Sequence, residues 1–232
     1  MKCPRCIQPV APAEESCRRC GYSLEVPDAQ LGHGAVSVER LTDADGIFTQ
    51  AERLSIRAVQ QEFERRFPQL FLMVFAGALP APASPRQFGF WLLNHAAIPD
   101  MDVLRPNECG LVLVVDPEAG AAGLTVGYFL ESYLGQDELG GVLEAGRKAF
   151  AQGRYVTAVR EVTRSLTRRL IQRTREAARD PAAFAPPAPP DARPFPAVKQ
   201  LGEPVPLPKP APATKPDGGG LVGNLGRRRD KG

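Results

Sequence analysis

The 232-residue chain has no long hydrophobic run, and this absence limits where the protein can reside. Its longest apolar stretches, residues 70–76 and 110–115, have the length of strands. A membrane-spanning helix needs roughly 20 consecutive apolar residues. The segment that begins at Met1 also lacks the apolar stretch of an export signal. We therefore expect a cytoplasmic protein without a membrane span.

The chain also lacks an excess of charge of one sign. Lysine and arginine number 29 against 26 aspartate and glutamate residues, a formal net charge of +3. This balance is too even to predict nucleic acid or an anionic membrane as an obligate partner. With 43% hydrophobic residues, the chain is long enough to bury one sizeable core.

Catalytic signatures are scarce as well. The chain has only two histidines, His33 and His95, and we place the first in a linker and the second at the end of a helix. It contains no P-loop and no phosphatase cysteine signature. The sequence therefore offers no recognisable nucleophile, phosphate clamp or positioned histidine.

Cysteine, by contrast, is concentrated at the N-terminus. Cys3 and Cys6 form one CxxC pair and Cys17 and Cys20 form a second, with ten residues between the pairs. Two such pairs complete the tetrahedral set of four thiolates that Zn²⁺ favours. Because four thiolates leave no open position for water, we predict a structural zinc ribbon.

Two other interpretations of these cysteines remain, a pair of disulfides and a thioredoxin-type redox pair. The absence of an export signal argues against the first, and the absence of strand-helix context argues against the second. The fifth cysteine, Cys109, precedes an apolar run and is interpreted as a small buried hydrophobe, with a reactive thiol as the alternative.

Composition divides the chain into four parts. We assign residues 1–25 to the zinc ribbon, 26–37 to a linker that lets the ribbon move, 38–180 to an α/β domain and 181–232 to a tail. The tail holds thirteen of the 24 prolines and cannot build a core, so we expect it to be disordered with polyproline II character. It would serve as a spacer or dock into aromatic grooves.

Capping motifs and periodicity predict the elements of the domain. Thr49 and Glu52 form a capping box at the start of one helix, and Ser84-Pro85 begins a second. Their expected buried residues are Leu54, Ala58, Val59, Phe63 and Phe67 in the first helix, and Phe88, Trp91, Leu92 and Ile98 in and after the second. Residues 70–76, 110–115 and 123–128 are predicted strands, the last two forming a hairpin.

The final helical region extends from about residue 136 to residue 180, with a break at 153–155. Its apolar face carries Val159, Val162, Leu166 and Leu170. Its other face carries a stripe of arginines at positions 160, 164, 168, 175 and 179. We interpret this stripe as a solvated face. A phosphate-rich partner is the alternative, although no base-stacking aromatics lie among the arginines.

Four segments resemble the TPM domain family, which is named for thylakoid-lumen, photosystem-repair and acetylcholine-receptor-accessory members. They are LTDADGIFT at residues 41–49, ECGLVLVV at 108–115, TVGYFLESYL at 125–134 and FAQGRY at 150–155. They match the family's Asp-x-Ala-Gly-like segment, its Gly-led strand, its Val-Gly-Tyr-Gly-Leu-Glu segment and its Phe-x-x-Gly-x-Tyr element, in that order. The resemblance implies an α/β/α sandwich with a small mixed sheet.

The resemblance implies several functions. Some members are described as acid phosphatases or as binding a divalent cation, whereas others act in the assembly or repair of membrane complexes, and many bacterial members are exported. This chain departs from the pattern at Phe129, where the family usually has glycine, and at residues 120–124, where a basic residue commonly opens the third strand. The bulky Phe129 would crowd a pocket next to Glu131.

Carboxylates carry the remaining chemical hypothesis. Asp43 and Asp45 precede the first helix of the domain, and Glu131 and Asp137 follow the third strand. One interpretation is that all four meet at strand ends, where α/β sheets bind ligands. Oxygen ligands of this kind suit Ca²⁺ or Mg²⁺. The alternative is that these residues cap loops and helices.

Together these patterns favour a non-catalytic, cytoplasmic TPM-domain interaction or assembly module, with protein partners bound through the ribbon, the domain or the tail. A divalent-cation-dependent acid phosphatase is the first alternative. A nucleic-acid-associated zinc-ribbon factor is the second, because Arg18, Arg19 and the terminal arginines would favour phosphates.

Overall fold

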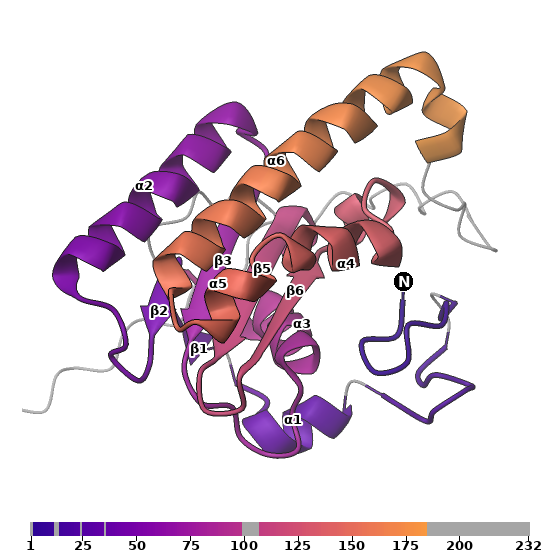
Figure 1. Cartoon of the computed structure of the whole chain (residues 1–232). Helices are drawn as coiled ribbons and strands as arrows, with labels where there is room; N and C mark the ends of the chain where they lie inside the picture. The colour runs from indigo at the N-terminus through magenta and orange to yellow at the C-terminus, as the bar shows by residue number, and fades with distance from the viewer. Residues whose placement is uncertain (1, 12–13, 24, 35, 99–106, 185–232) are drawn as a thin grey trace, which may run out of the picture. The chain divides into compact units, whose positions relative to one another are not determined.

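The computed structural model describes residues 2–11, 14–23, 25–34, 36–98 and 107–184. All of these belong to one compact unit, Met1–Pro189. The unit is an α/β/α sandwich, as the sequence predicted, with the four-cysteine segment at its N-terminus (Figure 1). Among the described residues, no helix combines the length and the apolar character needed to cross a bilayer.

A mixed four-stranded sheet forms the centre of the sandwich. Its strands are β2 (Leu41–Asp43), β3 (Phe71–Ala76), β5 (Gly110–Asp116) and β6 (Ala121–Val126), hydrogen-bonded in that order. The first three are parallel, and β6 returns antiparallel to β5. Every residue of β5 is buried, which confirms the expected central strand and its hairpin partner. A separate parallel pair joins β1 (Val36–Ser37) to β4 (Ala96–Ala97).

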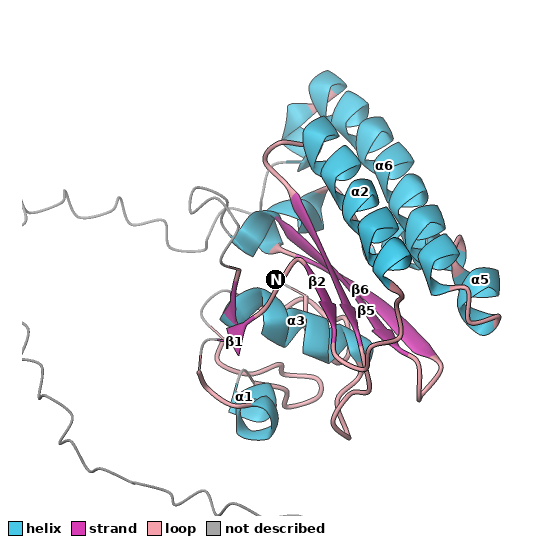
Figure 2. Ribbon diagram, turned by 90° about the vertical axis from the view of Figure 1, so that its left-hand side faces the viewer, coloured by secondary structure: helices cyan, strands magenta, loops and turns pink. Residues whose placement is uncertain are grey.

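Helices cover both faces of the sheet, as Figure 2 shows. On one face, α3 (Pro85–His95) packs against Met73, Val112 and Val114. Four helices in the described part of the chain cover the other face of the sheet, which carries Leu72 and Leu113. These are α2 (Gln50–Arg66), α4 (Gln136–Glu144), α5 (Arg147–Ala151) and α6 (Tyr155–Arg179). Alternate residues of β3 and β5 therefore enter two separate cores.

Both predicted helix starts are confirmed. The Thr49 hydroxyl accepts from the Glu52 amide, and the Glu52 carboxylate accepts from the Thr49 amide. Ser84 and Gln87 form a second reciprocal box at the start of α3, with Pro85 in its first turn. Each box satisfies amides that the first turn of a helix otherwise leaves unpaired.

The buried face of α2 matches the expected one only in part, since Phe63 is buried as predicted. Leu54 is 58% exposed and Ala58 is exposed, whereas Gln60 and Glu64 are buried. The Gln60 amide donates to the Arg40 carbonyl at 2.7 Å and to the Leu72 carbonyl at 2.9 Å. Because these carbonyls satisfy the Gln60 amide, α2 can bury this polar side chain next to Phe63.

The expected linker, residues 26–37, contains regular structure. Most of it lies in α1 (Glu25–Leu31) and in β1. The indole of Trp91 in α3 donates to the Gly32 carbonyl at 3.1 Å, which ties this segment to the domain. Local periodicity does not reveal such long-range contacts, which is why the sequence alone predicts a linker here.

The packed region also extends past residue 180. A 3₁₀ helix, η3 (Pro181–Phe184), places Phe184 at 7% exposure against Tyr133, with the Arg173 guanidinium 4.6 Å from its ring centre. The rest of the predicted tail, residues 185–232, lies outside the described residues.

Candidate functional site

The four N-terminal cysteines converge on one point. Their sulfur atoms all lie within 4.8 Å of one another, with Cys3 and Cys20 at 3.6 Å and Cys6 and Cys17 at 3.5 Å. A tetrahedron of zinc–sulfur bonds about 2.3 Å long places its sulfurs about 3.8 Å apart. The observed spacing therefore fits a single metal ion. Cys109 lies apart from this group and is half-buried.

Each cysteine pair lies in its own backbone turn, and the two turns have the same geometry. The Cys3 carbonyl accepts from the Ile7 amide at 2.9 Å, and the Cys17 carbonyl accepts from the Gly21 amide at 2.8 Å. Each turn closes on a residue in the left-handed region, with a φ of 68° at both Ile7 and Gly21. These matched turns aim the two thiols of each pair in the same direction.

The thiols differ in acidity. Burial raises the pKa of Cys3 to about 12. Burial also acts to raise the pKa of Cys17, but hydrogen bonds from the backbone of Cys20 and Arg19 outweigh it and lower that pKa to about 7. Since a metal binds thiolates, this lowered pKa favours Cys17 over Cys3 as a ligand at neutral pH.

Two hydrogen bonds hold the cysteine cluster against the domain. The Arg86 guanidinium of α3 donates to the Cys3 carbonyl at 2.8 Å, and the Lys2 amide donates to the Glu131 carboxylate at 3.1 Å. Burial lowers the pKa of Arg86, against the opposing influence of Cys3, Cys6 and Glu131.

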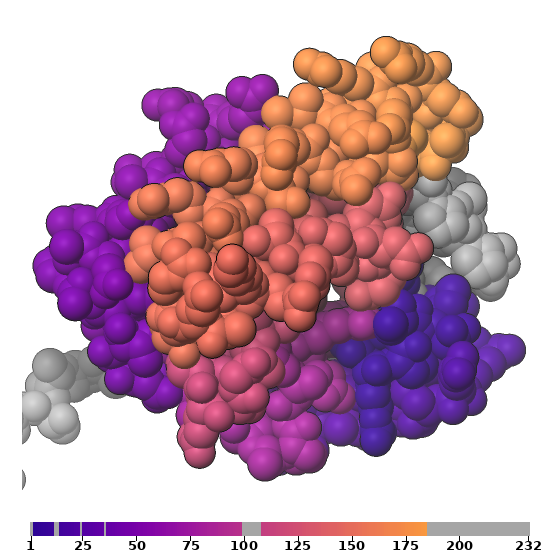
Figure 3. Space-filling view, in the orientation of Figure 1, coloured from indigo at the N-terminus to yellow at the C-terminus, as the bar shows by residue number. Residues whose placement is uncertain are grey.

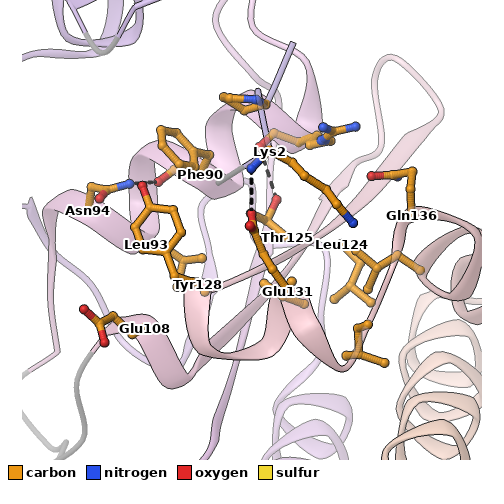
Figure 4. Close-up of a pocket in the computed structure, with 16 residues that line it drawn as sticks. Lys2, Phe90, Leu93, Asn94, Glu108, Leu124, Thr125, Tyr128, Glu131 and Gln136 are labelled. Atoms are coloured by element: carbon orange, nitrogen blue, oxygen red, sulfur yellow. Dashed lines mark hydrogen bonds between the residues drawn. The ribbon is translucent and has the colours of Figure 1, made fainter. Parts of the chain in front are cut away.

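A cavity of about 320 Å³ lies at this junction, and Figure 4 shows the residues around it. Apolar side chains such as Phe90, Leu124 and Leu139 contribute to its walls, together with Lys2 and Glu131. The cluster and the domain therefore build this cavity jointly.

The first two candidate carboxylates occupy the end of β2 and the loop after it. The Asp43 side chain is 1% exposed and accepts from the Ile47 amide at 2.9 Å and the Phe48 amide at 3.1 Å. It also pairs with Arg53 at 2.8 Å. Asp45 accepts from the Ala78 amide at 2.7 Å. Both carboxylates fix the loops at this edge of the sheet.

The other two candidate carboxylates, Glu131 and Asp137, lie at the opposite end of the strands. Strand register aligns Asp43 with Ala76, at the end of β3, whereas Val126 at the end of β6 pairs with Leu111 at the start of β5. Glu131 follows β6 in η2 (Tyr128–Ser132), and Asp137 lies in the first turn of α4. The antiparallel direction of β6 therefore separates the two pairs of carboxylates.

Sequence reasoning missed Asp116, which ends β5 at the same edge as Asp43 and Asp45. Its buried carboxylate accepts from the Ala119 amide at 2.9 Å and the Leu79 amide at 3.3 Å. Its position directly after the apolar run 110–115 was the available signal. Arg86 and Lys2 were also missed, and no local pattern marks them.

Comparison with known proteins finds a family match over most of the domain. A model of the TPM domain family matches residues 41–169. Among solved structures, the chain is similar to the N-terminal domain of the cg2496 protein from Corynebacterium glutamicum, determined by NMR in solution. That match has 16% identity and a TM-score of 0.44, and it covers 56% of this chain and 78% of the other. No curated protein matches the chain significantly.

Proposed function

Because the chain belongs to the TPM domain family, we propose that it is a non-catalytic, cytoplasmic interaction and assembly module that carries a structural zinc ribbon. One observation carries this proposal: four cysteine sulfur atoms lie within 4.8 Å of one another, and the cluster is hydrogen-bonded to the domain through Arg86 and Glu131. A closed thiolate set suits a structural ion, since it leaves no position for substrate.

The ion would stabilise a segment that has almost no core of its own. Apart from Cys3 and Cys17, the buried apolar residues in the described part of this segment are Pro4, Val10 and Tyr22. Modules of this size fold when four ligands share one metal, because binding then supplies the free energy that a larger core provides elsewhere. Zn²⁺ fits four thiolates better than Ca²⁺ or Mg²⁺, which prefer oxygen.

Elemental analysis of the purified chain tests the zinc assignment, with one zinc per chain expected. A Cys17→Ala variant should lose the metal, whereas a Cys109→Ala variant should keep it, since Cys109 lies outside the cluster. Zinc-free protein, or equal zinc in the Cys17→Ala variant, would remove the structural zinc ribbon from the proposal.

The carboxylates support the non-catalytic part of the proposal. Asp43, Asp45 and Asp116 each accept hydrogen bonds from backbone amides, and Asp43 also pairs with Arg53. Glu131 accepts from Lys2. These bonds use the oxygens to hold loops and to dock the cysteine cluster, which is a structural use of each carboxylate.

The alternative function is a divalent-cation-dependent acid phosphatase. One observation favours it: Asp43, Asp45 and Asp116 share the carboxyl edge of three parallel strands, where α/β sheets commonly bind ligands. In that case Ca²⁺ or Mg²⁺ would be held at this edge and would supply an activated water.

Hydrolysis of an aryl phosphate separates the two functions, measured at acidic and neutral pH with and without Mg²⁺ or Ca²⁺. The proposed function predicts no metal-dependent turnover. An Asp45→Asn/Asp116→Asn double variant and a Glu131→Gln variant serve as matched controls at the two edges. Metal-dependent hydrolysis that disappears only in the double variant would establish the phosphatase instead.

A further inference from the structure

Helices α2 and α6 lie side by side on one face of the sheet (Figures 1 and 2). Residues of both helices line a groove between them. The groove has a volume of about 470 Å³. Ala58, Val59 and Phe63 contribute apolar surface to it from α2, and Thr163 and Thr167 contribute from α6. We call this surface the α2–α6 groove.

The α2–α6 groove contains three residues of the apolar stripe that the sequence predicts on α2, Ala58, Val59 and Phe63. Ala58 is exposed and Val59 is half-buried, and Leu54, one turn before Ala58, is 58% exposed. The stripe therefore has helical periodicity but is only partly covered by the chain's own core. A partner helix could complete that cover, because apolar residues at this spacing form one face of a helix.

Arginines line the same groove. Arg66 comes from α2, and Arg160, Arg164 and Arg168 come from α6. An adjoining hollow of about 510 Å³ continues along α6 past Arg168. In the space-filling view, α6 forms a ridge beside α2 on this face (Figure 3).

This surface carries a strong local excess of positive charge. Helix α6 contains seven arginines and two glutamates, although the whole chain has a net charge of only +3. The two acidic residues that line the hollows are already engaged, Glu62 with Arg65 and Glu176 with Arg173. Within the part of the chain that the structure describes, Arg164 and Arg168 have no recorded carboxylate partner.

We propose that the α2–α6 groove binds an acidic amphipathic α-helix of a partner protein. The apolar side chains of that helix would cover Ala58 and Val59, and its carboxylates would pair with Arg164 and Arg168. Arginine suits this role because its planar guanidinium binds carboxylates in a bidentate manner. This inference rests on the interaction role proposed above and gives the class of partner.

Other occupants fit the groove less well. Nucleic acid would use the arginines but not the apolar floor, and no exposed aromatic side chain lines the described groove for base stacking. The chain's own residues 185–232 carry eight basic and four acidic side chains, so their net charge has the same sign as the groove. A second copy that paired through this face would bring arginines against arginines.

The test uses a fluorescein-labelled designed peptide with leucine at the a and d heptad positions and glutamate at most others. Its binding to the full chain is measured by anisotropy at low and high salt. A scrambled peptide of the same composition breaks the apolar stripe, and a lysine version reverses the charge. We expect the designed peptide to bind at least about tenfold more tightly than either control, with affinity falling as salt rises.

Variants locate the binding on the chain. The double variant Arg164→Glu/Arg168→Glu should lower the affinity for the designed peptide at least about tenfold, and so should the single variant Ala58→Glu. Arg147→Glu is the matched control, because Arg147 is an exposed arginine of α5 that does not line the groove. Unchanged melting temperatures would show that each variant is folded, and a chain ending at Phe184 should bind as the full chain does.

Three results would overturn the inference. The scrambled peptide could bind equally well, which would reduce the groove to a charged surface. Duplex DNA or phosphatidylglycerol vesicles could bind more tightly and lose affinity in the same arginine variants. The designed peptide could fail to bind the folded chain. Zinc content is measured on the same samples. If the peptide does not bind but one zinc per chain is present, the groove proposal is wrong and the zinc ribbon proposal is unaffected.

Discussion

At the scale of single residues, Ile7 stands in a conformation that favours glycine. Its φ of 68° equals that of Gly21 in the equivalent turn, and its side chain is 38% exposed. A β-branched residue in the left-handed region is strained by about 1–2 kcal/mol. Ile7→Gly should therefore stabilise the metal-bound cluster by about 1 kcal/mol, measured by competition for zinc with a chelator.

The matching substitution on the other turn should act in the opposite direction. Gly21→Ala places a side chain at the same φ and should weaken zinc retention by about 1 kcal/mol, although no atom lies within 4 Å of the added Cβ. If Ile7→Gly weakened zinc binding as well, the apolar contacts of Ile7 would matter more than its backbone strain.

Residues also show which parts of a site a sequence can reveal. The four cysteines were predictable because the two-residue spacing within each pair sets the ligand geometry locally. The predicted meeting of Asp43 and Asp45 with Glu131 and Asp137 depended on strand direction, and the antiparallel return of β6 places the two pairs at opposite ends of the strands. Arg86 acts by donating to the carbonyl of Cys3, far away in the sequence, so only the folded chain reveals its role.

At the scale of helices and strands, the capping box of α2 gives a prediction. Thr49→Ala removes the hydroxyl that accepts from the Glu52 amide and should lower the free energy of unfolding by about 1 kcal/mol. Ser84→Ala, at the start of α3, is a matched cap, and chemical denaturation compares the two. If neither substitution lowered the free energy of unfolding, packing alone would set where these two helices begin.

The same box predicts a pH dependence. Hydrogen bonds from the Thr49 amide and hydroxyl lower the pKa of Glu52 below its ordinary value. The folded state thus favours the carboxylate, so this contribution is present above the unfolded pKa and is lost as pH falls through the lowered one. NMR titration should find the lowered pKa, and Glu52→Gln should remove this part of the acid destabilisation.

Helix α2 shows why its start was predictable and its orientation was not. The cap is a local motif, and the structure confirms it at Thr49. Which face turns inward was decided by Gln60 and Glu64, whose partners lie across the sheet edge in Arg40 and Leu72. A hydrophobic pattern cannot reveal buried polar residues whose partners are distant in the sequence, here backbone carbonyls for Gln60 and the Arg40 guanidinium for Glu64. Two apolar residues that α2 leaves partly outside the core, Ala58 and Val59, line the α2–α6 groove.

At the scale of the whole molecule, the C-terminal boundary of the folded unit can be tested by truncation. A chain ending at Phe184 should melt as the full chain does, because the segment after it is too rich in proline to bury much apolar surface. A chain ending at Asp180 should melt lower, since it loses the contacts of Phe184 with Tyr133 and Arg173. Equal melting temperatures for both would show that η3 contributes nothing to stability.

Metal removal tests how the N-terminal segment and the domain depend on each other. The buried residues around the cysteines form a cluster separate from the two cores that flank the sheet. A chelator should therefore unfold residues near the cysteines while the domain keeps its far-UV circular dichroism and its own cooperative melt. Acidification should release the metal in the same way, because protons compete for the thiolates.

Trp91, the single tryptophan, reports on the junction during this experiment. Its indole donates to the Gly32 carbonyl, just after α1, and its ring stacks on His95. If loss of the metal releases α1 as well, Trp91 becomes more hydrated and its emission shifts to longer wavelength. An Arg86→Ala variant, which lacks the bond to Cys3, should lower the chelator concentration at which the shift occurs. A domain that unfolds together with the cysteine segment would instead show that the three cores form one cooperative unit.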